Sequence, residues 1–114
     1  MEQNDVVRKR SLAPVLHALS ATQVIAKLAL LDGWKLFGDG PDVAIEKTFH
    51  FSSYLQTIAF VNAVAFVAES RNHHPELVVD SQRCSVRWNT HELLGISGAD
   101  FACAARVDAL FSTE

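Results

Sequence analysis

The sequence has 114 residues, of which 49% are hydrophobic and 20% are charged. This length and composition fit one globular domain and exclude a disordered or a fibrous chain. Ten Lys and Arg residues against thirteen Asp and Glu residues give a formal net charge of −3, which argues against direct nucleic-acid binding through a basic face.

Membrane insertion and export are not indicated by the sequence. The longest nearly apolar stretch, residues 58–68, has 11 residues, whereas a membrane-spanning helix needs about 20. The first residues lack the apolar run of a signal peptide. We therefore predict a cytoplasmic protein without a membrane partner, in which Cys84 and Cys103 are buried free thiols.

The chain begins with a stretch that shows little periodicity. Residues 1–18 are predicted to form an N-terminal extension with little order, and residues 19–114 the domain. Ser20 and Gln23 have the spacing of a capping box and indicate the start of a helix. We expect this helix to end at Gly33, because glycine is favoured just beyond a helix C-terminus.

Two strands joined by a turn are expected next. Residues 34–37 form a short strand, and residues 38–42 (GDGPD) are rich in turn-forming residues. Residues 43–51 alternate between apolar and polar side chains, with Lys47 as an exception on the apolar side. This alternation is typical of a half-buried strand, so the segment predicts a β-hairpin.

The second half of the chain repeats this arrangement. Residues 55–72 form a helix that is apolar almost all round and is therefore expected to be buried on more than one side. Residues 76–79 and 83–88 form a second hairpin, and Ser97 caps a last helix that carries Phe101 and Phe111. The order α-β-β-α-β-β-α predicts an α+β fold, a four-stranded antiparallel sheet with three helices on one face.

Three of the five histidines are expected to lie close together. His73 and His74 are adjacent, and His91 follows His73 by 18 residues. The intervening segment is the second predicted hairpin, which returns the chain near its start. His17 and His50 are isolated in the sequence.

Clustered imidazoles suit proton transfer at neutral pH, because the unperturbed histidine pKa is about 6.5. Two other interpretations remain open. The first is a helix end with histidines on the surface. The second is a zinc site built from Glu69, His73 or His74, and His91, although the sequence has neither an HExxH motif nor a pair of cysteine ligands.

The motifs around these histidines resemble those of the pterin-4a-carbinolamine dehydratase family. The resemblance covers residues 19–111 and implies the same α-β-β-α-β-β-α fold. The segments that carry it are residues 69–76 (ESRNHHPE), 89–92 (NTHE) and 95–101 (GISGADF), with residues 33–34, 49–51 and 104–108 in the same order.

The resemblance implies dehydration of 4a-hydroxytetrahydropterin to quinonoid dihydropterin, in the recycling of a tetrahydrobiopterin-type cofactor of aromatic amino-acid hydroxylases. This reaction needs an acid and a base and no cofactor or metal. The resemblance implies that His73, His74 and His91 carry the reaction. We expect His73 and His91 to supply the acid and the base, in an order that the sequence does not fix, and His74 to bind and orient the pterin.

Three further residues are implied to bind or orient the substrate. Glu69 would orient a histidine, Pro75 would fix the backbone beside the two imidazoles, and Asp100 would hold the site from the start of the last helix. Two simpler roles stay open at this point. Glu69 can be an exposed helix carboxylate, and Asp100 can be only a helix cap.

The chain departs from the family pattern at Ser81, Gln82, Trp88 and Ala99. Some family members serve as dimerisation or assembly partners of other proteins, so a non-catalytic role with a protein partner is the alternative function. Because the apolar helix and the 76–79 strand leave apolar surface to cover, we expect a homodimer or a homotetramer.

Overall fold

The computed structural model describes residues 17–111, so residues 1–16 of the predicted extension lie outside the described part. The elements run α2 (Ala21–Leu28), β1 (Lys35–Phe37), β2 (Ala44–His50), α3 (Tyr54–Arg71), β3 (Glu76–Asp80), β4 (Arg83–Trp88) and α4 (Gly98–Phe111). Two short 3₁₀ turns, η1 (Gly40–Asp42) and η2 (His91–Leu93), complete the order.

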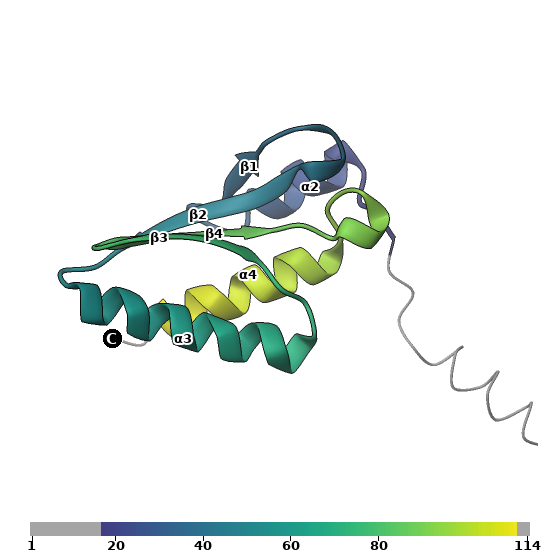
Figure 1. Cartoon of the computed structure of the whole chain (residues 1–114). Coiled ribbons are helices and arrows are strands. Elements are labelled where there is room, and N and C mark those ends of the chain that lie inside the picture. Colours follow the sequence, from purple (N-terminus) through teal and green to yellow (C-terminus); the bar gives the residue numbers. More distant parts are fainter. Residues whose placement is uncertain (1–16, 112–114) are drawn as a thin grey trace, which may run out of the picture.

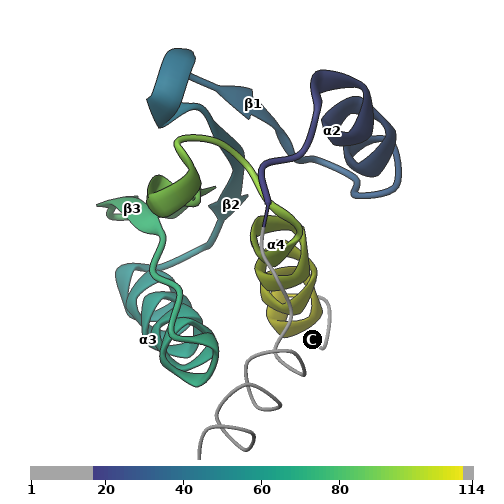
Figure 2. The ribbon, with the colours of Figure 1, turned by 90° about the vertical axis from the view of Figure 1, so that its right-hand side faces the viewer.

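The four strands form one antiparallel sheet in the order β1-β2-β4-β3. The helices α3 and α4 lie side by side beneath the sheet (Figure 1). Figure 2 shows α3, α4 and α2 following one another along the same side of the sheet. The predicted α+β fold, with two hairpins separated by a helix, is confirmed.

The core lies between the sheet and the helices. Ile45 and Trp88 face each other in the β2–β4 register and are fully buried. Val64 of α3 and Val107 of α4 are also fully buried and belong to the same apolar cluster. The charge of Lys47 on this side of β2 is accommodated because its amine donates to Asp108 Oδ1 of α4 at 2.9 Å.

The first helix is shorter than the sequence predicted. The capping box of Ser20 and Gln23 is present, but α2 ends at Leu28 and the chain then turns instead of remaining helical to Gly33. Gly33 has φ +88°, and a Cβ there would lie 2.9 Å from Lys47 Cε. Glycine is therefore required by the positive φ of the turn into β1, and not by the end of the helix.

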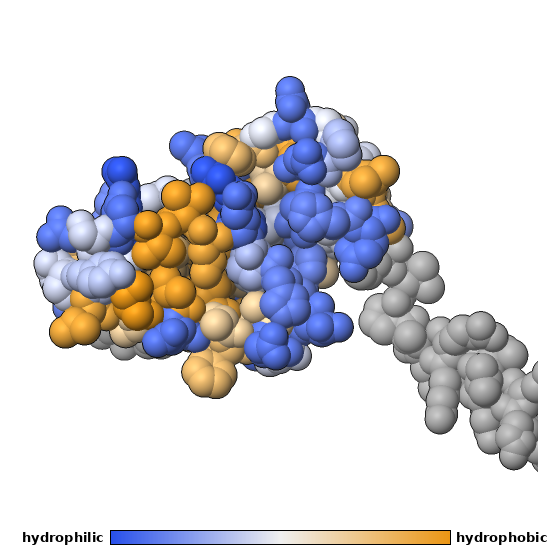
Figure 3. Space-filling model, in the orientation of Figure 1, coloured by the Kyte–Doolittle hydropathy of each residue, from blue (hydrophilic) through white to orange (hydrophobic). Residues whose placement is uncertain are grey.

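The central helix α3 begins after the N-cap Ser53, whose side chain accepts from the backbone N–H of Gln56. Within the single chain α3 packs on α4 and on strands β3 and β4, as expected for a helix buried on more than one side, but part of its apolar surface stays exposed. Its outward residues Leu55 and Phe66 are 81% and 78% exposed. Apolar side chains gather on the face that carries β3 and α3 (Figure 3).

Two further predictions can be checked on the described residues. Cys84 and Cys103 are both free and buried, as predicted. Among the helices of residues 17–111, none combines the length and apolar character needed to cross a membrane.

Candidate active site

His73 lies between the end of α3 and the start of β3. The helix ends at Arg71, and Asn72 takes the left-handed conformation with φ 50°. The backbone N–H of His73 then donates to Ala68 O at 3.1 Å, which closes the helix end. The imidazole stacks on the buried Trp88 ring, with centroids 5.4 Å apart. Its side chain is only 14% exposed.

Asp100, in the first turn of α4, forms a hydrogen bond with the His73 ring. Its Oδ1 lies 2.6 Å from His73 Nε2, and the carboxylate is fully buried. Its Oδ2 accepts from Thr90 Oγ1 at 2.7 Å and from the Ser97 backbone N–H at 2.9 Å. Asp100 therefore caps α4 and also fixes His73, so capping alone does not describe it.

These contacts define where the protons lie. The Thr90 hydroxyl gives its single proton to Asp100, so the Ser97 hydroxyl donates to Thr90 Oγ1 at 2.8 Å. A carboxylate that accepts from two other donors is best matched by an N–H on His73 Nε2. His73 Nδ1 is then the ring nitrogen that can exchange a proton.

His74 and Glu69 form a second histidine–carboxylate pair, at the surface. His74 Nε2 lies 2.9 Å from Glu69 Oε2, and both side chains are largely exposed. Such a pair adds little stability in water. Its effect is to restrict the orientation of the His74 ring. Pro75 is half-buried and leads directly into β3.

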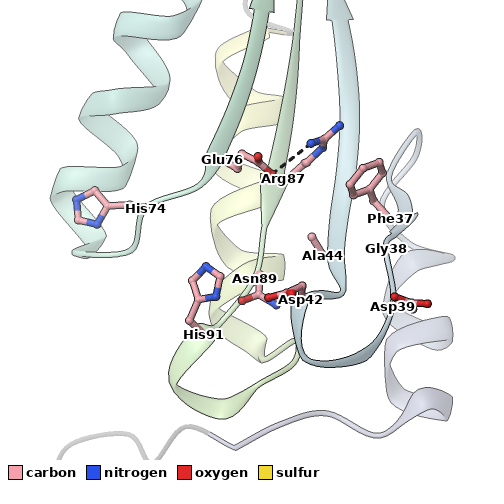
Figure 4. A pocket seen from close by; sticks show the side chains of 10 residues that line it. All are labelled: Phe37, Gly38, Asp39, Asp42, Ala44, His74, Glu76, Arg87, Asn89 and His91. Atoms are coloured by element: carbon pink, nitrogen blue, oxygen red, sulfur yellow. Dashed lines mark hydrogen bonds and ion pairs between the residues drawn. The ribbon is translucent and has the colours of Figure 1, made fainter.

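His74 and His91 line one cavity of about 420 Å³. The cavity lies between the start of β3, the end of β4 and the β1–β2 hairpin, as Figure 4 shows. The structure thus brings two of the three histidines to one cavity, and His73 is not among the lining residues. Adjacent residues in extended backbone point to opposite sides, which places His73 inward on Trp88 and His74 outward. The full lining is Phe37, Gly38, Asp39, Asp42, Ala44, His74, Glu76, Arg87, Asn89 and His91.

Arg87 is a lining residue that the sequence did not indicate. Its guanidinium donates to Glu46 at 2.7 Å and to Glu76 at 3.2 Å. It also lies over the Phe37 ring, 3.7 Å from the centroid. The hydrogen bond to Glu46 raises the pKa of Arg87 above its usual value. Only the register, which pairs Arg87 with both glutamates, reveals this cluster.

The three histidines are not arranged as a metal site. Glu69 pairs with His74, whereas His73 pairs with Asp100 and His91 belongs to the cavity wall. Within residues 17–111 no group of three or more His, Cys, Asp or Glu side chains is placed to share a metal ion.

The sequence and the fold were each compared with known proteins, and both comparisons point to one family. A family model described as pterin 4 alpha carbinolamine dehydratase matches residues 17–110. A relative from Paracidovorax citrulli (strain AAC00-1) is 55% identical over 98 residues, which is 86% of this chain and 84% of the relative. A relative from Bdellovibrio bacteriovorus is 47% identical over 118 residues, which is 100% of this chain and 94% of the relative. Both carry provisional names as pterin-4-alpha-carbinolamine dehydratases.

Two solved structures are similar to this chain. The crystal structure of a transcriptional coactivator/pterin dehydratase from Brucella melitensis has a TM-score of 0.77 and 28% identity, covering 82% of this chain and 98% of that one. A pterin dehydratase-like protein identified as a RuBisCO assembly factor in the alpha-carboxysome has a TM-score of 0.60 and 31% identity, covering 72% and 93%.

Proposed function

Because the chain belongs to the pterin 4 alpha carbinolamine dehydratase family, we propose that it dehydrates 4a-hydroxytetrahydropterin to quinonoid dihydropterin. The reaction serves the recycling of a tetrahydrobiopterin-type cofactor. One observation carries the proposal. His73 pairs with the fully buried Asp100, and Asp100 also binds Thr90, the residue before His91. His91 in turn shares a cavity with His74.

The chemistry needs two proton transfers and no redox step. The bond between C4a and the hydroxyl oxygen breaks, and the lone pair of the neighbouring ring nitrogen N5 forms the new C4a=N5 bond. Hydroxide is a poor leaving group, so an acid protonates the oxygen and it departs as water. A base takes the N5 proton. The net change is the loss of one water molecule, which positioned imidazoles can catalyse.

The two histidine–carboxylate pairs suggest a division of these tasks. We assign the acid and base roles to His73 and His91. Asp100 holds the Nε2 proton of His73 and leaves Nδ1 to exchange a proton. His74 lines the cavity and is oriented by Glu69, which suits a role in binding the pterin.

We also propose that the protein functions as a homodimer or a homotetramer. The β3 strand lies at the edge of the sheet, and its Val78 and Val79 side chains are 46% and 38% exposed. Leu55 and Phe66 add exposed apolar surface on α3. Apolar edge strands and apolar helix faces favour association of copies through an interface that is the same on both.

The proposed function is tested by a dehydratase assay. A synthetic 4a-hydroxytetrahydropterin is formed in the cuvette, and its conversion to the quinonoid dihydropterin is followed by absorbance with and without the protein. We expect acceleration by the wild-type protein and by His50→Ala, and none by a His73→Ala, His91→Ala double variant. A folded wild-type protein that leaves the spontaneous rate unchanged would contradict the proposal and favour the non-catalytic assembly role.

A further inference from the structure

Asn89 follows β4 directly, and its side chain is held by the hairpin that joins β1 and β2. Its Nδ2 donates to Val43 O at 2.6 Å and to Pro41 O at 3.3 Å. Both neighbours are carbonyl oxygens, which can only accept. The amide nitrogen must therefore face them, and the orientation of the amide is fixed with Oδ1 on the other side.

Among residues 17–111 no group donates a hydrogen bond to the Oδ1 atom, although Asn89 is only 8% exposed. Asn89 lines the cavity, and Figure 4 shows its side chain beside Asp42, between the hairpin and His91. A buried acceptor without a partner costs stability. Such an atom in a cavity wall is explained when a bound ligand supplies the missing donor.

The charged residues of the cavity favour a ligand that carries hydrogen-bond donors over an anionic ligand. Three carboxylates, those of Asp39, Asp42 and Glu76, line the cavity together with a single guanidinium, that of Arg87. The guanidinium is already engaged by Glu76 and by Glu46. Apart from the imidazoles of His74 and His91, the polar groups that this wall offers to a ligand are therefore mainly hydrogen-bond acceptors.

We infer that Asn89 Oδ1 accepts a hydrogen bond from the 2-amino group of the pterin and thereby orients the ring in the cavity. This inference rests on the proposed function, since it takes the pterin as the ligand. The 2-amino group lies at the pyrimidine end of the bicyclic ring, away from C4a and N5. Anchoring that end at Asn89 leaves the reacting atoms free to face the histidines. Asn89 is thus a specificity-determining residue, and the hydrogen bonds from its Nδ2 to the hairpin hold Oδ1 in place.

Binding of two stable ligands tests this assignment. The first is 6,7-dimethyl-7,8-dihydropterin, and the second is the same compound with hydrogen in place of the 2-amino group. Dissociation constants are measured by calorimetry for the wild-type protein, for Asn89→Ala and for Asn62→Ala. The Asn62 amide is exposed on α3 and is the matched control.

We expect loss of the 2-amino group to weaken binding to the wild-type protein and to Asn62→Ala by about tenfold, as for one hydrogen bond to a buried acceptor. Asn89→Ala should bind the two ligands equally well. If Asn89→Ala does not fold, Asn89→Gln, which moves the oxygen by one methylene, should show the same loss of discrimination.

A wild-type protein that binds both ligands equally well overturns the inference, and this result needs no variant. The inference is also overturned if removal of the 2-amino group lowers the affinity of the wild-type protein and of Asn89→Ala by the same factor. The dehydratase assay is read separately. If the protein distinguishes the two ligands through Asn89 but does not catalyse dehydration, the proposed reaction alone is refuted. If it catalyses dehydration but binds both ligands equally well, the inference about Asn89 alone is refuted.

Discussion

His73 Nε2 and Asp100 Oδ1 lie 2.6 Å apart although 27 positions separate the two residues in the sequence. The contact joins the end of α3 to the first turn of α4. Through Asp100 it also reaches Thr90, the residue before His91. One buried carboxylate thus sets the position of one proposed catalytic histidine and of the segment that carries the other.

Asp100→Asn should lower both stability and activity. The amide NH₂ would oppose donors that now point at a carboxylate, and the buried mismatch should cost about 1–3 kcal/mol of unfolding free energy. The Nε2 proton of His73 would no longer be held, so kcat should fall as well. Thermal denaturation and the dehydratase assay measure the two effects. The control is Asp80→Asn, since Asp80 pairs with Arg83 in solvent, and a result equal to that control would contradict the role of Asp100.

Replacement of single histidines should separate proton transfer from binding. His73→Ala and His91→Ala should each lower kcat by about 10²-fold or more, the usual contribution of a positioned acid or base. His74→Ala should mainly raise KM, because we assign His74 to binding the pterin. His50→Ala, at an exposed position of β2, is the matched control and should behave as the wild-type protein. Near-normal kcat in both the His73 and His91 variants would remove them from the chemistry.

Activity should survive removal of metal ions. The reaction transfers protons and releases water, which imidazoles can catalyse without a Lewis acid. The test is dialysis against a chelator, followed by elemental analysis and the dehydratase assay. About one zinc per chain, with activity that is lost on its removal and regained on its return, would sink this prediction.

The thiols should be unreactive in the folded protein at pH 8. Burial raises the pKa of the Cys84 thiol from 9.0 to about 11, and burial also raises that of Cys103. Because the thiolate is the reactive form, labelling by iodoacetamide should be slow until the chain unfolds. The raised pKa also means that the unfolded thiol ionises first, so stability should fall as pH rises from about 9 to about 11. Fast labelling of the native protein at pH 8 would argue against this burial.

Sedimentation equilibrium at micromolar concentration should show a dimer or a tetramer. The exposed β3 edge and the outward apolar residues of α3 provide the surface for association. Val78→Lys should shift the equilibrium towards the monomer, because a charge on an edge strand opposes pairing between sheets. A single wild-type species of 12.5 kDa would be evidence against the proposed assembly.

Features that depend on neighbouring residues could be predicted from the sequence. The capping box at Ser20, the alternation along β2 and the turn-forming residues between the strands are local patterns, and the elements follow them. The spacing of His73, His74 and His91 around a hairpin predicted a cluster of three, of which the structure brings His74 and His91 to one cavity and leaves His73 outside its lining. Capping hydrogen bonds and hydrophobic periodicity within a short segment favour a helix, a strand or a turn there, independently of the tertiary contacts of that segment.

Only the tertiary structure decided which side chains meet across the sheet and between the helices. The strand order placed Arg87 between Glu46 and Glu76, and the packing of α4 brought Asp100 to His73. The amide of Asn89 contacts backbone carbonyls 46 and 48 positions away. Local sequence does not specify such contacts, because a one-residue change of register would turn each of these strand side chains to the other face. The sequence by itself therefore determined the elements and the candidate histidines, whereas packing and register determined which of them line the cavity and which stand behind it.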